Sequence, residues 1–220
     1  IANVALPDMA AAFGATPRDV QWVVIAYLVT LTAAIVTAGR LGDRAGRRNV
    51  LLAGVVLFAV SSAGAVLAQG LWTLVGLRAL QGIAAAAIVS QTMALVGDVV
   101  PKDQTGRAMG LIATVSAVGT ALGPSLGGAL VAGFGWASIF IALAVVGLLT
   151  LVVGFAALPR DAAPRGSLGC DLPGTAILSV TLGAFALTTS QVATPALTAI
   201  LAGLSIAGFA AFVWVERRAT

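Results

Sequence analysis

Two long apolar runs of this chain are separated by the stretch Gly39-Arg40-Leu41-Gly42-Asp43-Arg44-Ala45-Gly46-Arg47-Arg48-Asn49-Val50. Its glycines at positions 39, 42 and 46 allow a tight reversal and a close approach of helices. Asp43 can accept hydrogen bonds from an arginine or cap the N-terminus of a facing helix, which would make a latch that forms and breaks. The alternative is a solvated basic turn that only fixes topology, and these residues alone favour that alternative.

The composition requires lipid around much of the chain. Of 220 residues, 60% are hydrophobic and only 9% are charged, and the mean hydropathy is +1.06. A soluble domain carries about a quarter charged residues, so this chain has too little charge to coat a water-facing surface. The net charge of +4 is spread over short loops, which argues against a nucleic-acid partner.

The apolar runs have the length of membrane-spanning helices. A bilayer core of about 30 Å needs about 20 helical residues. A stub covers Ile1 to about Leu6, and the predicted helices cover 20–40, 49–68, 72–97, 106–132, 136–157, 173–191 and 195–215. Backbone groups in lipid must be satisfied within the segment, so we predict an all-α membrane protein.

Basic residues fall mainly on one side of these helices. Ten of the twelve lie in turns on that side: Arg40, Arg44, Arg47, Arg48, Lys102, Arg107, Arg160, Arg165, Arg217 and Arg218. Cytoplasmic loops carry an excess of Lys and Arg, so we expect this side to be cytoplasmic. The stub is then expected to leave the membrane on the outside at Pro7, and Trp22, Trp72 and Trp136 open helices at the outer face.

Residues 39–50 resemble, at every fixed position, the G-x-L-a-D-r-x-G-r-[rk]-x-[lvi] signature of major facilitator transporters. The resemblance implies the major facilitator fold, in which two lobes alternate between inward-open and outward-open states. It also implies a gating motif made of Gly39, Asp43, Arg44, Gly46, Arg47 and Arg48.

One arginine lies inside a predicted span, in Leu77-Arg78-Ala79-Leu80-Gln81-Gly82. On insertion scales an intramembrane arginine costs about 2.5–3.5 kcal/mol. Arg78, Gln81 and Gly82 share one helix face, which should point into the bundle, although Arg78 could instead snorkel to the outer surface. The segment resembles the R-x-x-q-G motif of proton-coupled antiporters, which implies a role for these three residues in proton coupling.

Glycines recur every fourth residue in the stretch 119–128, Gly-Thr-Ala-Leu-Gly-Pro-Ser-Leu-Gly-Gly. They would form a groove for close helix contact, and Pro124 should bend the helix. The stretch resembles the g-x-x-x-G-P-x-x-G-G element of exporters in the superfamily, which implies outward transport. The positions that match are Gly119, Gly123, Pro124, Gly127 and Gly128.

Three further segments resemble fourteen-span drug:proton antiporters: Asn3-Val4-Ala5-Leu6-Pro7, Asp171-Leu172-Pro173-Gly174 and Phe212-Val213-Trp214-Val215-Glu216-Arg217-Arg218. This subfamily implies an N-terminal six-helix lobe followed by two linker helices. We therefore assign 1–158 to the lobe, from the end of helix 1 to helix 6, 159–172 to a cytoplasmic linker and 173–220 to two additional helices. The apolar start at Ile1 and the stop at Thr220 suggest a fragment truncated at both ends.

The chain also departs from the subfamily pattern. Ala137 and Ser138 replace an Arg-Trp pair after Gly135-Trp136, and Leu143 and Val145 stand where the family has Asn and Pro. The family's first-helix acid falls before Asn3, and no Asp or Glu lies in the middle of a predicted span.

The resulting hypothesis is proton-coupled export of amphipathic, often cationic drugs, with substrate near the midplane between two lobes. Residues that could line the path are Asn3, Tyr27, Gln81, Gln91 and Thr120, although ordinary interhelix hydrogen bonds explain each as well. One alternative is a narrow native cargo such as an antibiotic, a siderophore or an amino acid. The other is a membrane scaffold or sensor that transports nothing.

We expect no enzyme activity, no metal and no cofactor other than the proton gradient. The chain has no His and one Cys, Cys170, and it shows no nucleophile motif or phosphate-binding loop. The expected partners are the bilayer, protons and an amphipathic small molecule. We expect a monomer in a bacterial cell membrane, since the Ala-, Gly- and Arg-rich composition suggests a GC-rich genome.

Overall fold

A computed structural model describes residues 2–158, 172–188 and 198–209 of the chain. In those residues the regular secondary structure is helical, and short turns join the helices. The elements in chain order are η1 (Ala2–Ala5), α1 (Leu6–Phe13), α2 (Pro17–Val20), α3 (Trp22–Ala45), α4 (Arg47–Val66), α5 (Leu71–Val99), α6 (Thr105–Phe134), α7 (Ala137–Ala157) and α8 (Leu172–Thr188), and a further helix covers Thr198–Phe209.

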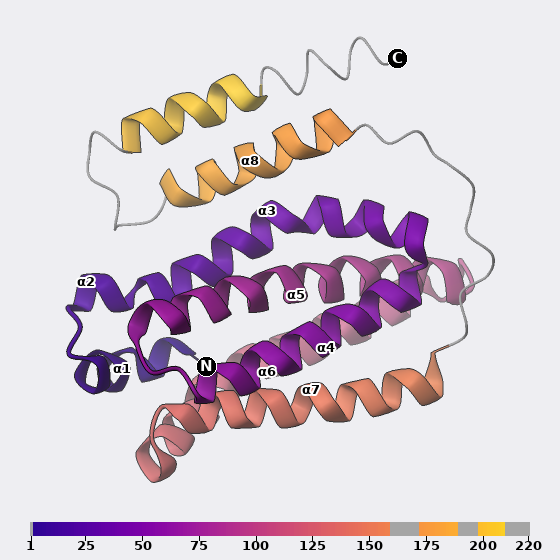
Figure 1. The fold of residues 1–220 in the computed structure, drawn as a ribbon. Helices are drawn as coiled ribbons and strands as arrows, with labels where there is room; N and C mark the ends of the chain where they lie inside the picture. The colour runs from indigo at the N-terminus through magenta and orange to yellow at the C-terminus, as the bar shows by residue number, and fades with distance from the viewer. Residues whose placement is uncertain (1, 159–171, 189–197, 210–220) are drawn as a thin grey trace.

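Five of the described helical segments are long and apolar enough to cross a membrane. They are Pro17–Ala45, Arg47–Val66, Leu71–Val99, Thr105–Phe134 and Ala137–Ala157, and each overlaps one of the first five predicted spans. The last two predicted spans are described only in part, as α8 and Thr198–Phe209, so their full length is not tested. Figure 1 shows α3, α4, α5 and α7 running side by side along one common direction.

Small residues let these helices approach closely. A Cβ added to Gly54 on α4 would lie 2.9 Å from the Ala87 side chain of α5, and one added to Gly147 on α7 would lie 3.1 Å from Ala59 on α4. Large apolar side chains instead point outward, as Val152 and Val153 do at 68% and 62% exposure. Exposed side chains of this kind suit a surface that faces lipid.

The start of the chain differs from the prediction. The expected stub was to end at Leu6 and leave the membrane at Pro7, whereas α1 begins at Leu6 and continues to Phe13 with Pro7 in its first turn. Proline is tolerated there because the first N–H groups of a helix have no intrahelical partner. Gly14, at a φ of 58°, ends the helix in the left-handed conformation that favours glycine.

The helix before Gly46 is longer than predicted. The span 20–40 extends through Ala45, so Gly39, Gly42 and Asp43 lie within α3 and not in a turn. Of the three glycines expected to make the reversal, only Gly46 has a positive φ, at 94°. The reversal is therefore a single residue, and α4 begins directly after it at Arg47.

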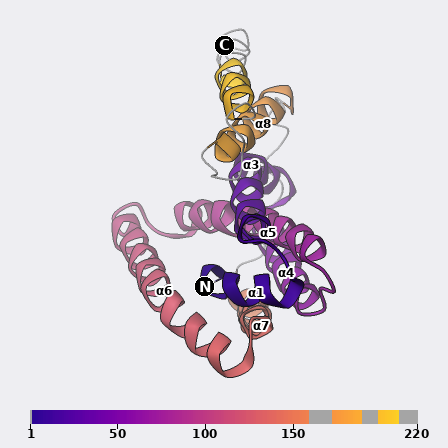
Figure 2. The same ribbon diagram turned by 90° about the vertical axis from the view of Figure 1, so that its left-hand side faces the viewer.

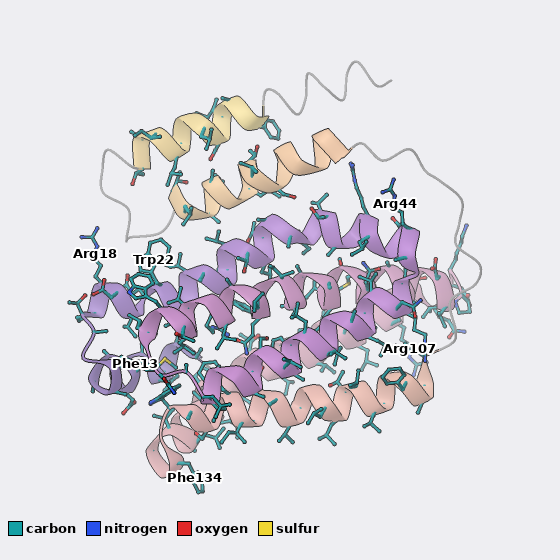
Figure 3. The ribbon with its side chains drawn as sticks, in the orientation of Figure 1. Phe13, Arg18, Trp22, Arg44, Arg107 and Phe134 are labelled. Carbon is teal, nitrogen blue, oxygen red and sulfur yellow. The ribbon has the colours of Figure 1, made fainter. Side chains whose placement is uncertain are left out.

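A hydrophobic cluster joins the helix ends at the end of the bundle predicted to face outside. Its buried members are Ala5, Met9, Val20, Val23, Ala65, Leu71, Leu74, Ile139 and Phe140. Phe13 and Trp136 extend it, with ring centroids 5.2 Å apart. In Figure 3, Phe13, Arg18 and Trp22 lie at this end, and Arg44 and Arg107 lie at the opposite end, which agrees with the predicted polarity of the bundle.

Ser138 shows how the chain joins α6 to α7 where it departs from the family pattern. Its hydroxyl lies 3.0 Å from the Leu130 carbonyl oxygen and 2.6 Å from that of Gly135. Ser138 is buried, and it ties the end of α6 to the first turn of α7.

The outer helices of the bundle pack less extensively. Figure 2 shows α6 standing apart from α4 and α5, and it contacts η1, α7 and the end of α5. On another side, α8 lies along α3, where Thr37 Oγ1 and Ser179 Oγ are 2.9 Å apart and a Cβ on Gly183 would lie 3.4 Å from Ala33.

Candidate functional site

Arg47 joins the ends of three helices. From the first turn of α4 it contacts Asp43 near the end of α3, with Nη2 2.9 Å and Nε 3.1 Å from Oδ1. Its Nη1 lies 3.0 Å from Asp98 Oδ2 and 2.8 Å from the Ala94 carbonyl oxygen, both on α5. One guanidinium therefore holds two acids from different helices.

The exposure of these groups sets the strength of the contact. The side chains of Arg47, Asp43 and Asp98 are 24%, 43% and 31% exposed. Exposed ion pairs contribute about 0–1 kcal/mol each, so a network of two pairs holds the helix ends together without locking them. A contact of this strength can form and break during a conformational cycle.

Arg48 makes a different set of contacts. Its Nε donates to the Leu158 carbonyl oxygen at 3.2 Å and its Nη2 to that of Phe155 at 3.3 Å. The guanidinium also lies over the Phe155 ring, 5.7 Å from its centroid. The last carbonyls of a helix have no intrahelical donor, so Arg48 caps the end of α7 and favours its negative dipole.

The remaining gating-motif residues lie close by. Gly39 is on α3, where an added Cβ would only reach 4.0 Å from Ser90 Cβ, so close helix contact does not require glycine there. Arg44 is exposed in the last turn of α3 and points away from the bundle in Figure 3. The predicted motif is thus brought together at one end of the bundle, and Arg47 is its centre.

Arg78 is buried, at 6% exposure, in the interior of α5. Its Nε donates to the Val23 carbonyl oxygen at 3.0 Å, and its Nη1 donates to Gln81 Oε1 at 2.7 Å. The guanidinium also stacks 4.4 Å from the centroid of the Tyr27 ring. Arg78 therefore points into the bundle as predicted, and it does not snorkel to the surface.

Gln81 links Arg78 to a third helix, α4. It is fully buried, and its Nε2 donates to Ser62 Oγ on α4 at 2.6 Å. Ser62 in turn donates to the Phe58 carbonyl oxygen at 2.6 Å. Arg78, Gln81 and Ser62 form one hydrogen-bonded chain across α3, α5 and α4.

Gly82 is needed for close approach. An added Cβ would overlap Thr30 Oγ1 and the Tyr27 carbonyl oxygen, and would lie 3.1 Å from the backbone nitrogen of Leu31. Thr30 donates across the same contact to the Ala79 carbonyl oxygen at 2.9 Å. The predicted trio of Arg78, Gln81 and Gly82 thus fixes α5 against α3.

The glycine motif of the exporter resemblance lies on α6. Gly123 and Gly127 are buried, Gly119 is exposed, and Pro124 lies inside an uninterrupted helix. A Cβ on Gly128 would lie 3.8 Å from Val4 Cγ1, so this part of the stretch faces the N-terminal segment. Nothing lies within 4 Å of a Cβ on Gly119 in the described part of the chain.

The five predicted path-lining residues do not share one surface. Asn3 and Thr120 are exposed, and Tyr27 is half-buried against Arg78. Gln81 and Gln91 are fully buried at helix contacts. Their role in binding substrate stays a prediction.

Sequence reasoning missed three partners of these residues: Ser62, Thr30 and Asp98. Ser61 and Ser62 are adjacent hydroxyls in an otherwise apolar helix, and that pairing could have indicated a buried hydrogen-bond partner. Asp98 was placed on the cytoplasmic side, but its distance of 55 residues from Asp43 hides their common contact with Arg47.

Known proteins resemble the chain over nearly its whole length. The sequence model of the Major Facilitator Superfamily matches residues 1–216. The multidrug resistance protein Stp of Mycobacterium tuberculosis is 34% identical over 100% of this chain and 42% of its own length. The tetracenomycin C resistance and export protein of Streptomyces glaucescens shows the same identity and the same two coverages.

A third relative carries a different name. The riboflavin transporter RibZ of Clostridioides difficile is 31% identical over 79% of this chain and 38% of its own length. The chain thus spans about two fifths of the length of these curated relatives. The described helices are long and apolar, as in an all-α, multi-pass membrane protein. Since the family model covers residues 1–216, the chain belongs to the major facilitator superfamily.

Proposed function

We propose that this chain is part of a fourteen-span drug:proton antiporter that exports amphipathic, often cationic compounds by alternating access. Two relatives support the cargo class by their names, which are multidrug resistance protein Stp and tetracenomycin C resistance and export protein. The glycine motif on α6 supports the direction of transport. Bacterial relatives support a bacterial cell membrane.

The observation that carries the proposal is the environment of Arg78. It is buried, and it contacts uncharged groups: a carbonyl, an amide oxygen and an aromatic ring. Among the described residues Arg78 has no carboxylate partner, whereas Arg47 pairs with both Asp43 and Asp98. A buried charge without a counter-charge is costly, so a functional role is the best explanation for Arg78 at this position.

This arrangement supports proton coupling. A lone buried cation lowers the free energy of a nearby carboxylate and would favour release of its proton. It would also repel a cationic drug bound nearby, so the proton and the drug would compete. In this proposal Arg78 supplies the electrostatic link, and Gln81 holds its guanidinium in place.

The contacts of Arg47 support a gate at this end of the bundle. A closed inner end keeps Asp43, Arg47 and Asp98 together, and opening separates at least one pair. Because each pair is partly exposed and weak, substrate binding can supply the energy to break it.

Ethidium flux tests the proposal. The complete gene product is reconstituted in proteoliposomes, and flux is measured with and without an imposed pH gradient. Gradient-driven flux that a protonophore abolishes supports drug:proton exchange. Flux that is the same with and without the pH gradient contradicts proton coupling.

A narrow native cargo is the second candidate, and the similarity to the riboflavin transporter RibZ favours it. Fold does not fix cargo. In that case ethidium gives no flux, while one compound from a panel of antibiotics, siderophores, amino acids and riboflavin does. A protein that moves none of these, even with an imposed gradient, would be a scaffold or a sensor.

A further inference from the structure

Gln91 lies fully buried between α3 and α5, two helical turns before Asp98. Its Nε2 donates to the Ala38 carbonyl oxygen of α3 at 2.6 Å and to Ser90 Oγ at 3.2 Å. Its Oε1 has no hydrogen-bond partner among the described residues. The opposite amide orientation would place an oxygen against the Ala38 carbonyl, so the donor faces α3.

The unpartnered oxygen faces Gly42. An added Cβ on Gly42 would overlap Oε1, Cδ and Nε2 of Gln91. Gly42 is buried inside α3 and has no positive φ, so backbone freedom does not explain this glycine. The Gln91 amide occupies the space that any side chain at position 42 would need.

This contact lies directly beside the charged cluster of Arg47. Gly42 precedes Asp43 on α3, and Gln91 is one turn before Ala94, whose carbonyl accepts from Arg47 at 2.8 Å. Arg47 must reach Asp43 at 2.9 Å and Asp98 at 3.0 Å at once. It can do so only while the ends of α3 and α5 keep their present spacing.

We propose that Gln91 and Gly42 form a clasp that sets this spacing and so positions the two acids for Arg47. Gln91 is then a positioning residue and not a contact for substrate. The role in gating rests on the proposed function, whereas the spacing does not. The donor Nε2 supplies the polar part of the clasp, since Oε1 has no partner.

The spacing can be measured directly in the complete gene product. Every native cysteine, including Cys170, is replaced, and spin labels are attached to cysteines substituted for Leu41 and Val99, which are 52% and 60% exposed. The EPR distance distribution is compared among wild type, Gly42→Ala, Gln91→Ala, Gln91→Met and the Gly42→Ala/Gln91→Ala double variant. Gly97→Ala is the matched control, because Gly97 lies on the same helix as Gln91 and a Cβ added there would meet nothing within 4 Å.

The clasp predicts a specific pattern. Gly42→Ala lengthens or broadens the distribution, and the double variant is no more perturbed than Gln91→Ala alone, since shortening Gln91 removes the clash. Gln91→Met keeps the volume but loses the donor, so it also broadens the distribution, whereas Gly97→Ala does not. Additive effects of the two Ala substitutions, or a wild-type distribution in Gln91→Met, would overturn the clasp.

Flux measurements test whether the clasp, besides setting the helix spacing, also has a role in gating. If Gln91 positions the two acids for Arg47, Gln91→Met lowers flux by at least about threefold, a typical coupling for contacting residues, and Gly97→Ala leaves flux unchanged. Undiminished flux in Gln91→Met, together with a broadened EPR distance distribution, overturns the positioning role in gating. If wild type gives no flux, the proposed function fails, and the EPR pattern still decides the clasp.

Discussion

The guanidinium of Arg78 donates a 2.7 Å hydrogen bond to the amide oxygen of Gln81, and both side chains are buried. Through the Gln81 amide nitrogen this bond continues to Ser62 at 2.6 Å. One polar chain thus crosses an apolar bundle from α3 to α4. Each member satisfies the next, so removing one leaves a buried partner unpaired.

Arg78→Ala should uncouple export from the proton gradient. It removes the buried cation and leaves Gln81 Oε1 without its donor, which should cost about 1–3 kcal/mol of stability. The check is ethidium flux in proteoliposomes at equal reconstituted protein, with and without protonophore. Arg107→Ala, an exposed arginine at the start of α6, is the control. An unchanged response to protonophore would make Arg78 a packing residue.

Gln81→Leu and Gln81→Glu should act differently. Leucine leaves Arg78 Nη1 and Ser62 Oγ without their Gln81 partner, so the unfolding midpoint in detergent should fall. Glutamate gives Arg78 a permanent counter-charge, which should retain more stability but weaken coupling. The measurement compares heat stability, by gel filtration after heating, with gradient-driven flux. Equal losses of both quantities in the two variants would contradict an electrostatic role.

Asp43→Asn should abolish transport while membrane insertion stays intact, because the ion pair with Arg47 forms at the predicted gate. Asp98→Asn should have a similar effect through the second pair. If the two acids act through Arg47, the double variant should lower the unfolding midpoint in detergent by less than the sum of the two single losses, since contacting residues are not additive. Transport activity at matched expression measures the first effect, and heating in detergent followed by gel filtration measures the second. Full transport by Asp43→Asn would remove the gate from the mechanism.

The sequence predicts the helices and the positions of charge better than the contacts between helices. Apolar runs of about 20 residues indicate membrane spans directly. Turns rich in Arg and Lys indicate which end of the bundle is cytoplasmic. It fails at Pro7, which suits a helix start as well as a helix end, and at residues 39–45, where glycines suggest a turn but the helix continues. Helix propensity is a weak guide where packing decides.

Contacts between distant residues are what the sequence does not contain. The partners of Arg78 on α3 and of Gln81 on α4 lie 55 and 19 residues away. Residue spacing indicated the shared face of Arg78, Gln81 and Gly82, because that relation is local to one helix. The choice of Ser62, Thr30 and Asp98 as partners depends on how the helices pack, so only the structure reveals it.

Gly82→Ala should destabilise the bundle, whereas Gly76→Ala on the same helix should not. The added methyl at position 82 would overlap the Tyr27 carbonyl oxygen, and a backbone atom cannot rotate away. Overpacking of this kind costs about 1–3 kcal/mol. A Cβ on Gly76 meets nothing within 4 Å, so alanine there should be neutral or stabilising by up to about 1 kcal/mol through helix propensity. Heating in detergent followed by gel filtration measures both. Equal unfolding midpoints for the two variants would show that α3 and α5 are not in close contact at Gly82, and Arg78 would lose the support that this packing gives it.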